Sequence, residues 1–195
     1  MPHFARCYLT VAVVLLALPA CRGCQASGAP TPEEAFQTLE RAISAGDAAA
    51  FYACLDRATQ AAIAETYQEE RLQRTIVQAK YPEAEAGPAL AKLAAAAEED
   101  APRFFVKVAA ERKIVEGYRK RLGSVSGPIA KKTVSPDVLF LSRQDGMPFK
   151  FARNSDGSWG FSELGPEWVM EKERASHAVK TVRDNAALYE KAGTP

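Results

Sequence analysis

The feature that most constrains the fold is a change in the spacing of apolar residues near Gly127. Before this glycine, apolar side chains recur every three or four residues, which is typical of amphipathic helices. After it, they alternate with polar residues in short segments bounded by turn residues, which is typical of antiparallel strands. Helical spacing returns from about Pro166 to Lys191. The sequence therefore predicts an α+β fold with five or six helices, a small three- to four-stranded antiparallel meander and a long C-terminal helix.

Local signals predict where the helices begin and end. Thr31 is a good N-cap, with proline directly after it and Glu34 three residues later, so a helix is expected to start there. Gly46 is expected to end this helix, and Asp47 to cap a short second one. Three further helices are expected: from Thr59 to about Lys80, in the alanine-rich segment 89–99 that follows a break at Pro82, Gly87 and Pro88, and from Asp100 to Gly123.

The expected strands lie in the segments "IAKKTV", "DVLFLSRQ", "MPFKFAR" and "SWGFSEL". The dipeptide Asp145-Gly146 between two of them is a strong hairpin signal. Side chains alternate across a strand, so Phe149 and Phe151 share one face of theirs, as do Trp159 and Phe161. We expect these four aromatic residues either to bury that face against helices or to line an apolar pocket under the sheet.

The first twenty residues have the organisation of a secretory signal peptide. Arg6 precedes an apolar run of about ten residues, half of the roughly 20 that a helix needs to cross a bilayer. At its end, Leu18, Pro19, Ala20 and Cys21 resemble the signal of bacterial lipoproteins, in which an aliphatic residue and two small residues precede the lipid-bearing cysteine. Residues 21–30 are interpreted as a flexible tether, and 31–195 as a single helix-rich α+β domain.

The lipoprotein resemblance implies a lipid anchor on Cys21. In that family the cysteine thiol carries a diacylglyceryl group, cleavage falls before the cysteine, and the new amino terminus is acylated. A non-acidic residue in the next position, here Arg22, usually accompanies sorting to the outer membrane. Two or more acyl chains hold a protein stably on a bilayer, so we expect a lipid-anchored protein of the bacterial cell envelope that faces the periplasm. The alternatives are an ordinary secretory signal with Cys21 unmodified, and a thiol–disulfide site formed by Cys21 and Cys24.

Three cysteines remain once Cys7 is removed with the signal peptide. If Cys21 is acylated, Cys24 and Cys54 are a candidate disulfide pair in an oxidising envelope. The bridge would tie the tether to the second helix. The alternative is that Cys54 is a free thiol, buried as a small apolar residue.

The body of the chain has a second resemblance. The segments "TPEEAFQTLERAISAGDAAAFYACL" and "DGSWGFSEL" are similar to the opening helices and to a sheet strand of the cone-shaped α+β fold named after nuclear transport factor two. That fold also occurs in small bacterial lipoproteins, and where it is catalytic it uses Asp, His or Tyr residues of an interior pocket. This chain differs from it by extra helix between about residues 59 and 122, and by ending on a long helix instead of a strand.

The charges are unevenly distributed along the chain. Residues 31–100 hold 6 basic and 13 acidic side chains, whereas residues 101–132 hold 9 basic and 2 acidic ones. The basic segment is a candidate surface for anionic lipid headgroups or an acidic partner, through Arg112, Lys113, Arg119, Lys120 and Arg121. The alternative is that these cations pair with acidic helices of the same chain and favour the C-terminal end of their own helix.

Composition and motifs argue against several classes of function. Without residues 1–20, the chain has as many basic as acidic side chains, so no overall field recruits nucleic acid. His177 is then the only histidine, which argues against histidine metal clusters and Ser-His or Cys-His catalysis. We therefore expect no cofactor, no metal and no catalysis, but a binding or assembly module whose partners are the membrane, through the lipid anchor, and an envelope protein. The alternative is a small-molecule-binding or hydrolytic enzyme that uses the apolar pocket.

Overall fold

The computed structural model describes residues 28–123 and 126–192. In these ranges the chain forms seven α-helices and one four-stranded antiparallel sheet, which confirms the α+β class and the long C-terminal helix. The helix number is slightly higher than expected. The elements, in chain order, are α1 (Pro32–Ala45), α2 (Ala48–Ala53), α3 (Arg57–Lys80), α4 (Glu83–Lys92), the 3₁₀ turn η1 (Ala95–Ala97), α5 (Ala101–Glu111), α6 (Ile114–Leu122), β1 (Ile129–Ser135), β2 (Val138–Arg143), β3 (Phe149–Arg153), β4 (Trp159–Phe161) and α7 (Gly165–Ala192).

The helix caps agree with the local signals in the sequence. The Thr31 hydroxyl accepts a hydrogen bond from the Glu34 backbone N–H at 3.2 Å, and the Asp47 carboxylate caps α2. The third helix begins earlier than expected, because Asp56 is its N-cap and accepts from the Thr59 backbone N–H at 2.9 Å. Short polar side chains can satisfy the unpaired N–H groups of a first helical turn without help from the rest of the fold.

The single helix expected from Asp100 to Gly123 is two helices in the structure. Lys113 takes the left-handed conformation, with φ of 54°, and this residue separates α5 from α6. A continuous helix over these residues would be about 33 Å long and straight. The break instead lets α5 pack against α2 and α3 while α6 packs against α1.

The alanine-rich region also differs from the expectation. Helix α4 begins at Glu83 and continues through Gly87 and Pro88, which were expected to precede a helix. Pro88 lies inside the helix, where its missing N–H costs a single intrahelical hydrogen bond. The run of alanines that follows forms the 3₁₀ turn η1. None of the residues of α4 is buried, so Gly87 and Pro88 in this helix do not disturb the packing of the core.

The sheet is an antiparallel meander in the order β1-β2-β3-β4. The β2–β3 connection is a five-residue loop, Gln144 to Pro148, in which Asp145 has a positive φ of 64°. The inner face of the sheet is buried against helices and carries five large apolar side chains: Leu139, Leu141, Phe149, Phe151 and Phe161.

The β4 edge of the sheet is covered by main chain from two distant segments. Ala29 forms two backbone hydrogen bonds with Trp159, at 2.9 and 2.8 Å. Beside them, the Phe161 N–H donates to the Cys54 carbonyl at 2.8 Å. The described chain therefore enters the fold at β4, immediately before α1.

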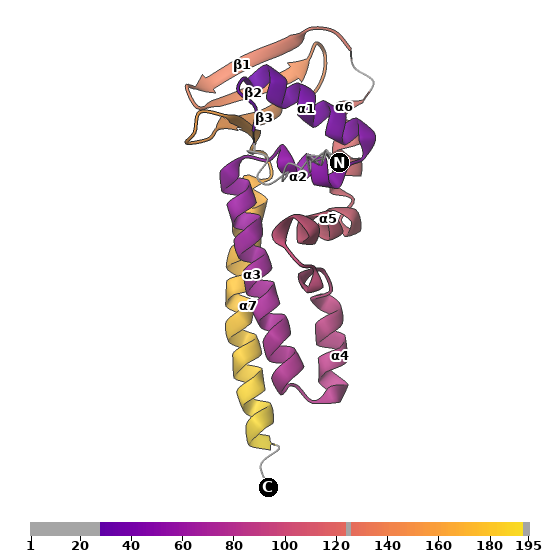
Figure 1. Ribbon diagram of the computed structural model, residues 1–195, viewed down its shortest axis with the longest axis vertical. Coiled ribbons are helices and arrows are strands. Elements are labelled where there is room, and N and C mark those ends of the chain that lie inside the picture. The colour runs from indigo at the N-terminus through magenta and orange to yellow at the C-terminus, as the bar shows by residue number, and fades with distance from the viewer. Residues whose placement is uncertain (1–27, 124–125, 193–195) are drawn as a thin grey trace, which may run out of the picture.

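The long helices form an arm that extends away from the sheet (Figure 1). Helices α3 and α7 both start beside the sheet and run in parallel, with Gln73 donating to the Ala175 carbonyl at 2.9 Å and Tyr81 donating to the Val182 carbonyl at 3.3 Å. Helix α4 returns along α3 toward the sheet. We refer to α3, α4 and α7 together as the arm.

Candidate functional site

The four aromatic residues expected on the inner face have two different environments. Phe149, Phe151 and Phe161 are at most 1% exposed and form core contacts. The Phe36 ring of α1 lies 5.7 Å from Phe149 and 6.0 Å from Phe151, centroid to centroid. These three residues are therefore core residues, whereas Trp159 lies beside a cavity.

The cavity at Trp159 has a volume of about 480 Å³ and lies where the described chain enters the fold. Small residues line most of it: Gly28 and Ala29 before α1, Ala35 and Thr38 of α1, and Ala50 and Ala53 of α2, together with Cys54. Cys54 is buried and forms no disulfide with any of the described residues, and burial raises the pKa of its thiol to about 11. Its candidate disulfide partner Cys24 lies outside the described residues, as does the candidate lipidation site Cys21, so both remain predictions.

Arg112, in the segment between α5 and α6, faces the start of α7. Its guanidinium lies 3.1 Å from the Glu171 carboxylate and 3.6 Å from that of Glu167. It also lies over the Trp168 ring, 5.9 Å from the centroid. The cation expected to meet an external anion is thus surrounded by acidic and aromatic groups of its own chain.

The other cations of the predicted basic surface point to different partners. Arg119 donates to the Ile43 and Ser44 carbonyls at the end of α1, and Lys120 pairs with Glu116 on its own helix at 2.8 Å. Arg121 pairs with Glu163 and donates to a backbone carbonyl before β3. Lys113 adopts the left-handed conformation between the two helices. Four of these five residues thus have contacts of their own within the chain, and Arg112, Lys113 and Arg121 together line a shallow hollow of about 380 Å³. The binding of an external anion by this segment stays a prediction.

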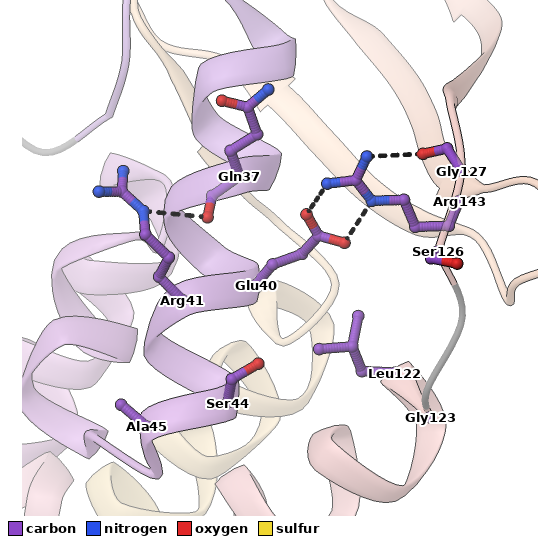
Figure 2. Close-up of a pocket in the computed structure, with 10 residues that line it drawn as sticks. All are labelled: Gln37, Glu40, Arg41, Ser44, Ala45, Leu122, Gly123, Ser126, Gly127 and Arg143. Atoms are coloured by element: carbon purple, nitrogen blue, oxygen red, sulfur yellow. Dashed lines mark hydrogen bonds and ion pairs between the residues drawn. The ribbon is translucent and has the colours of Figure 1, made fainter.

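A cleft of about 1010 Å³ lies between α1 and the end of β2 (Figure 2). Its polar centre is the ion pair of Glu40 with Arg143, in which two guanidinium nitrogens donate to the two carboxylate oxygens at 2.8 and 2.6 Å. The third Arg143 nitrogen donates to the Gly127 carbonyl at 2.8 Å. Figure 2 shows that Arg41, one residue after Glu40, points away from this pair.

The geometry of this ion pair favours a structural role over a chemical one. Both oxygens of Glu40 accept hydrogen bonds from a group that stays protonated in proteins, so this carboxylate is a poor general base. The pair instead fastens α1 to the sheet. Sequence reasoning missed it, although Arg143 falls on the same face of its strand as Leu139 and Leu141. A charged residue on an apolar strand face was the available signal.

Glu70 of α3 is the carboxyl group with the largest upward pKa shift in the described part of the chain. Burial raises its pKa to about 7, and the negative charges of Glu171 and Glu111 add to this effect, while Arg112 opposes it. The group lies where the arm joins the rest of the fold. It is a candidate for proton binding near neutral pH.

The outer face of the sheet carries a row of three side chains across neighbouring strands. Lys132 of β1 pairs in register with Phe140 of β2, which pairs with Lys150 of β3. A shallow hollow of about 400 Å³ lies over this face, lined in part by Phe140 and Pro148. We call the side chains of Ala130, Lys132, Phe140, Ser142, Pro148 and Lys150 the outer sheet surface.

The remaining candidates and the comparisons with known proteins do not assign an activity. His177 is exposed on α7, and within residues 28–123 and 126–192 no group of three or more His, Cys, Asp or Glu residues is placed to hold a metal ion. Over the same residues, no helix has the length and apolar character to cross a membrane. The sequence matches no family model, no curated protein and no solved structure.

Proposed function

We propose that this protein is a lipid-anchored binding or assembly module of the bacterial cell envelope, without catalytic activity of its own. The anchor is the cysteine of the segment Leu18-Pro19-Ala20-Cys21, and the location is the outer membrane, facing the periplasm. The described fold begins seven residues after Cys21, so the anchor would hold the whole body close to the bilayer.

The arm is the observation that carries the binding role. Helices α3 and α7 have 24 and 28 residues, which corresponds to lengths of about 36 and 42 Å. Large apolar side chains remain exposed along the arm, including Leu72, Met170 and Leu188. A long helical surface with exposed apolar residues is suited to contact another protein. The aromatic face of the sheet, by contrast, is mostly filled by its own side chains.

Fractionation of cells tests the anchor. The wild-type chain is expected in the outer-membrane fraction, whereas Cys21→Ser is expected to lose this position. Cys24→Ser is the matched control, because it removes a thiol three residues away and leaves the lipidation signal intact. Equal fractionation of all three proteins would contradict the anchor.

Site-specific cross-linking tests the arm. A photoreactive residue at Met170 or Leu188 is expected to yield one discrete cross-linked band with an envelope protein. The same residue at Ala110, exposed on α5 outside the arm, is the control for random collisions. Identical cross-linking at all three positions, or none at either arm position, would contradict a binding surface on the arm.

A second candidate function rests on the cavity beside Trp159. Its apolar lining and its volume of about 480 Å³ fit a small apolar ligand. Titration with such ligands is expected to change tryptophan fluorescence in the wild type but not in Trp159→Phe, because the remaining Trp168 is buried in the core. An unchanged signal in the wild type would remove this candidate.

A further inference from the structure

We propose that the outer sheet surface rests on anionic phospholipid headgroups. This inference deepens the proposed function, since it depends on an anchored protein and names the lipid chemistry that its body contacts. The surface would act as a second, weak attachment beside the lipid anchor.

Basic side chains on the two faces of the sheet differ in their ion pairs. On the inner face, Lys131 pairs with Glu33 at 3.1 Å and Arg143 pairs with Glu40, while Arg153 donates to the Gly157 carbonyl. On the outer face, Lys132 and Lys150 have no ion pair within the described residues, and no acidic residue occupies an outward position of β1, β2 or β3. The ammonium groups of Lys132 and Lys150 on the outer face are therefore available to an external anion.

Apolar groups accompany these lysines. Phe140 lies between them, half-buried on the sheet, and Val134 and Met147 at opposite ends of the strands are 61% and 58% exposed. Lysines beside a half-buried aromatic ring and exposed aliphatic groups match the headgroup region of a bilayer, where anionic phosphate lies next to apolar chains. An acidic protein would satisfy the lysines but would have no need of the apolar groups.

The length of the chain before the fold places the bilayer within reach. Cys21 precedes Gly28 by seven residues, which span at most about 25 Å. Ala29 is hydrogen-bonded to β4, and β1 lies three strand spacings further, about 14 Å away. A protein anchored at Cys21 therefore keeps the whole sheet near the membrane surface.

Co-sedimentation with vesicles tests the surface without the anchor. The protein used is residues 21–195 with Cys21 unacylated, which includes all of the described residues. We expect it to sediment with vesicles that contain phosphatidylglycerol and to stay in the supernatant with pure phosphatidylcholine vesicles. We expect 0.5 M salt to release it from the anionic vesicles. Each lysine near an anionic surface contributes about fivefold to binding, so Lys132→Gln with Lys150→Gln should weaken it about 25-fold.

A matched double variant distinguishes the effect of the two outer-surface lysines from the effect of a lower net charge. Lys92→Gln with Lys180→Gln removes the same charge from exposed positions on the arm and should change binding by less than about twofold. Phe140→Ala should weaken binding without removing charge, with circular dichroism reporting that each variant is folded. Equal binding by both lysine pairs, or binding only to an acidic protein, would overturn the inference.

The result is distinguishable from failure of the proposed function. Loss of vesicle binding together with an acylated Cys21 would leave the anchor standing and remove only this surface. An unmodified Cys21 together with selective vesicle binding would remove the anchor and leave the outer sheet surface as a lipid-binding surface.

Discussion

Glu40 and Arg143 illustrate how single side chains join distant parts of this fold. Their side chains are 15% and 25% exposed, and they connect α1 with the end of β2 across 103 positions of sequence. The Arg143 guanidinium also lies over the Phe36 ring, 5.8 Å from its centroid. A mostly buried ion pair of this kind matters chiefly because removal of one partner leaves the other charge unpaired.

We therefore expect Arg143→Met and Glu40→Met each to lower the free energy of unfolding by about 1 to 3 kcal/mol. The double variant should lose less than the sum of the two, because it leaves no unpaired charge. Urea unfolding of the four proteins measures this coupling. Additive losses would show that the pair does not hold α1 to the sheet.

Glu70 gives the protein a pH-dependent stability. Its pKa is about 7 in the folded state and near 4.5 in an unfolded chain, so the folded state binds more protons between these values. The contribution to stability is fully present below pH 4.5 and is lost as the pH rises through 7. Because the carboxyl is partly solvated, we expect a loss of about 1 to 2 kcal/mol between pH 5 and pH 8.

Glu70→Gln should flatten this pH profile and raise stability at pH 8. Glu69→Gln, which changes the neighbouring carboxyl, should keep the wild-type slope. Thermal unfolding between pH 5 and pH 8 measures both variants. A wild-type slope in Glu70→Gln would assign the dependence to another group.

The helices and strands show how far local sequence determines this structure. Caps at Thr31, Asp47 and Asp100 could be predicted because a polar side chain and the N–H groups it binds lie within three residues. The break at Lys113 could not, because nothing in its neighbours opposes a continuous helix and only packing of α6 against α1 requires the turn. Arg143 had a visible signal as a charge on an apolar strand face, whereas Glu40, on a distant helix, had none.

Lys113 gives a prediction about the α5–α6 junction. Glycine adopts positive φ without the steric cost that other residues incur, so Lys113→Gly should stabilise the protein by about 0.5 to 1 kcal/mol. Lys113→Val should destabilise it, because a β-branched residue tolerates this conformation poorly. Chemical denaturation of both variants measures the difference. Destabilisation by glycine would contradict the left-handed geometry at this position.

The whole molecule depends on close contact between the sheet and the start of the arm. A Cβ atom added at Gly160 would lie 2.5 Å from the Asp56 Cα, which is backbone and has little freedom to move. Next to it, the Asp56 N–H donates to the Phe161 carbonyl at 3.0 Å. Gly160 therefore allows α3 to begin directly on β4.

Gly160→Ala should destabilise the protein by about 2 to 4 kcal/mol. Gly117→Ala is the matched control, because a Cβ there meets no atom within 4 Å and alanine favours the helix. It should be neutral or stabilising. Melting temperatures that fall equally in both variants would contradict the packing of the arm on the sheet.

At the same scale, we propose that a hydrocarbon anchor holds the sheet near a bilayer while the arm remains available to a partner. The most direct measurement is the intact mass of the N-terminal peptide of protein extracted from native membranes. We predict a peptide that begins at Cys21 and carries a diacylglyceryl group and an N-linked acyl chain. A peptide that begins at Cys21 or elsewhere with an unmodified thiol would contradict the central claim.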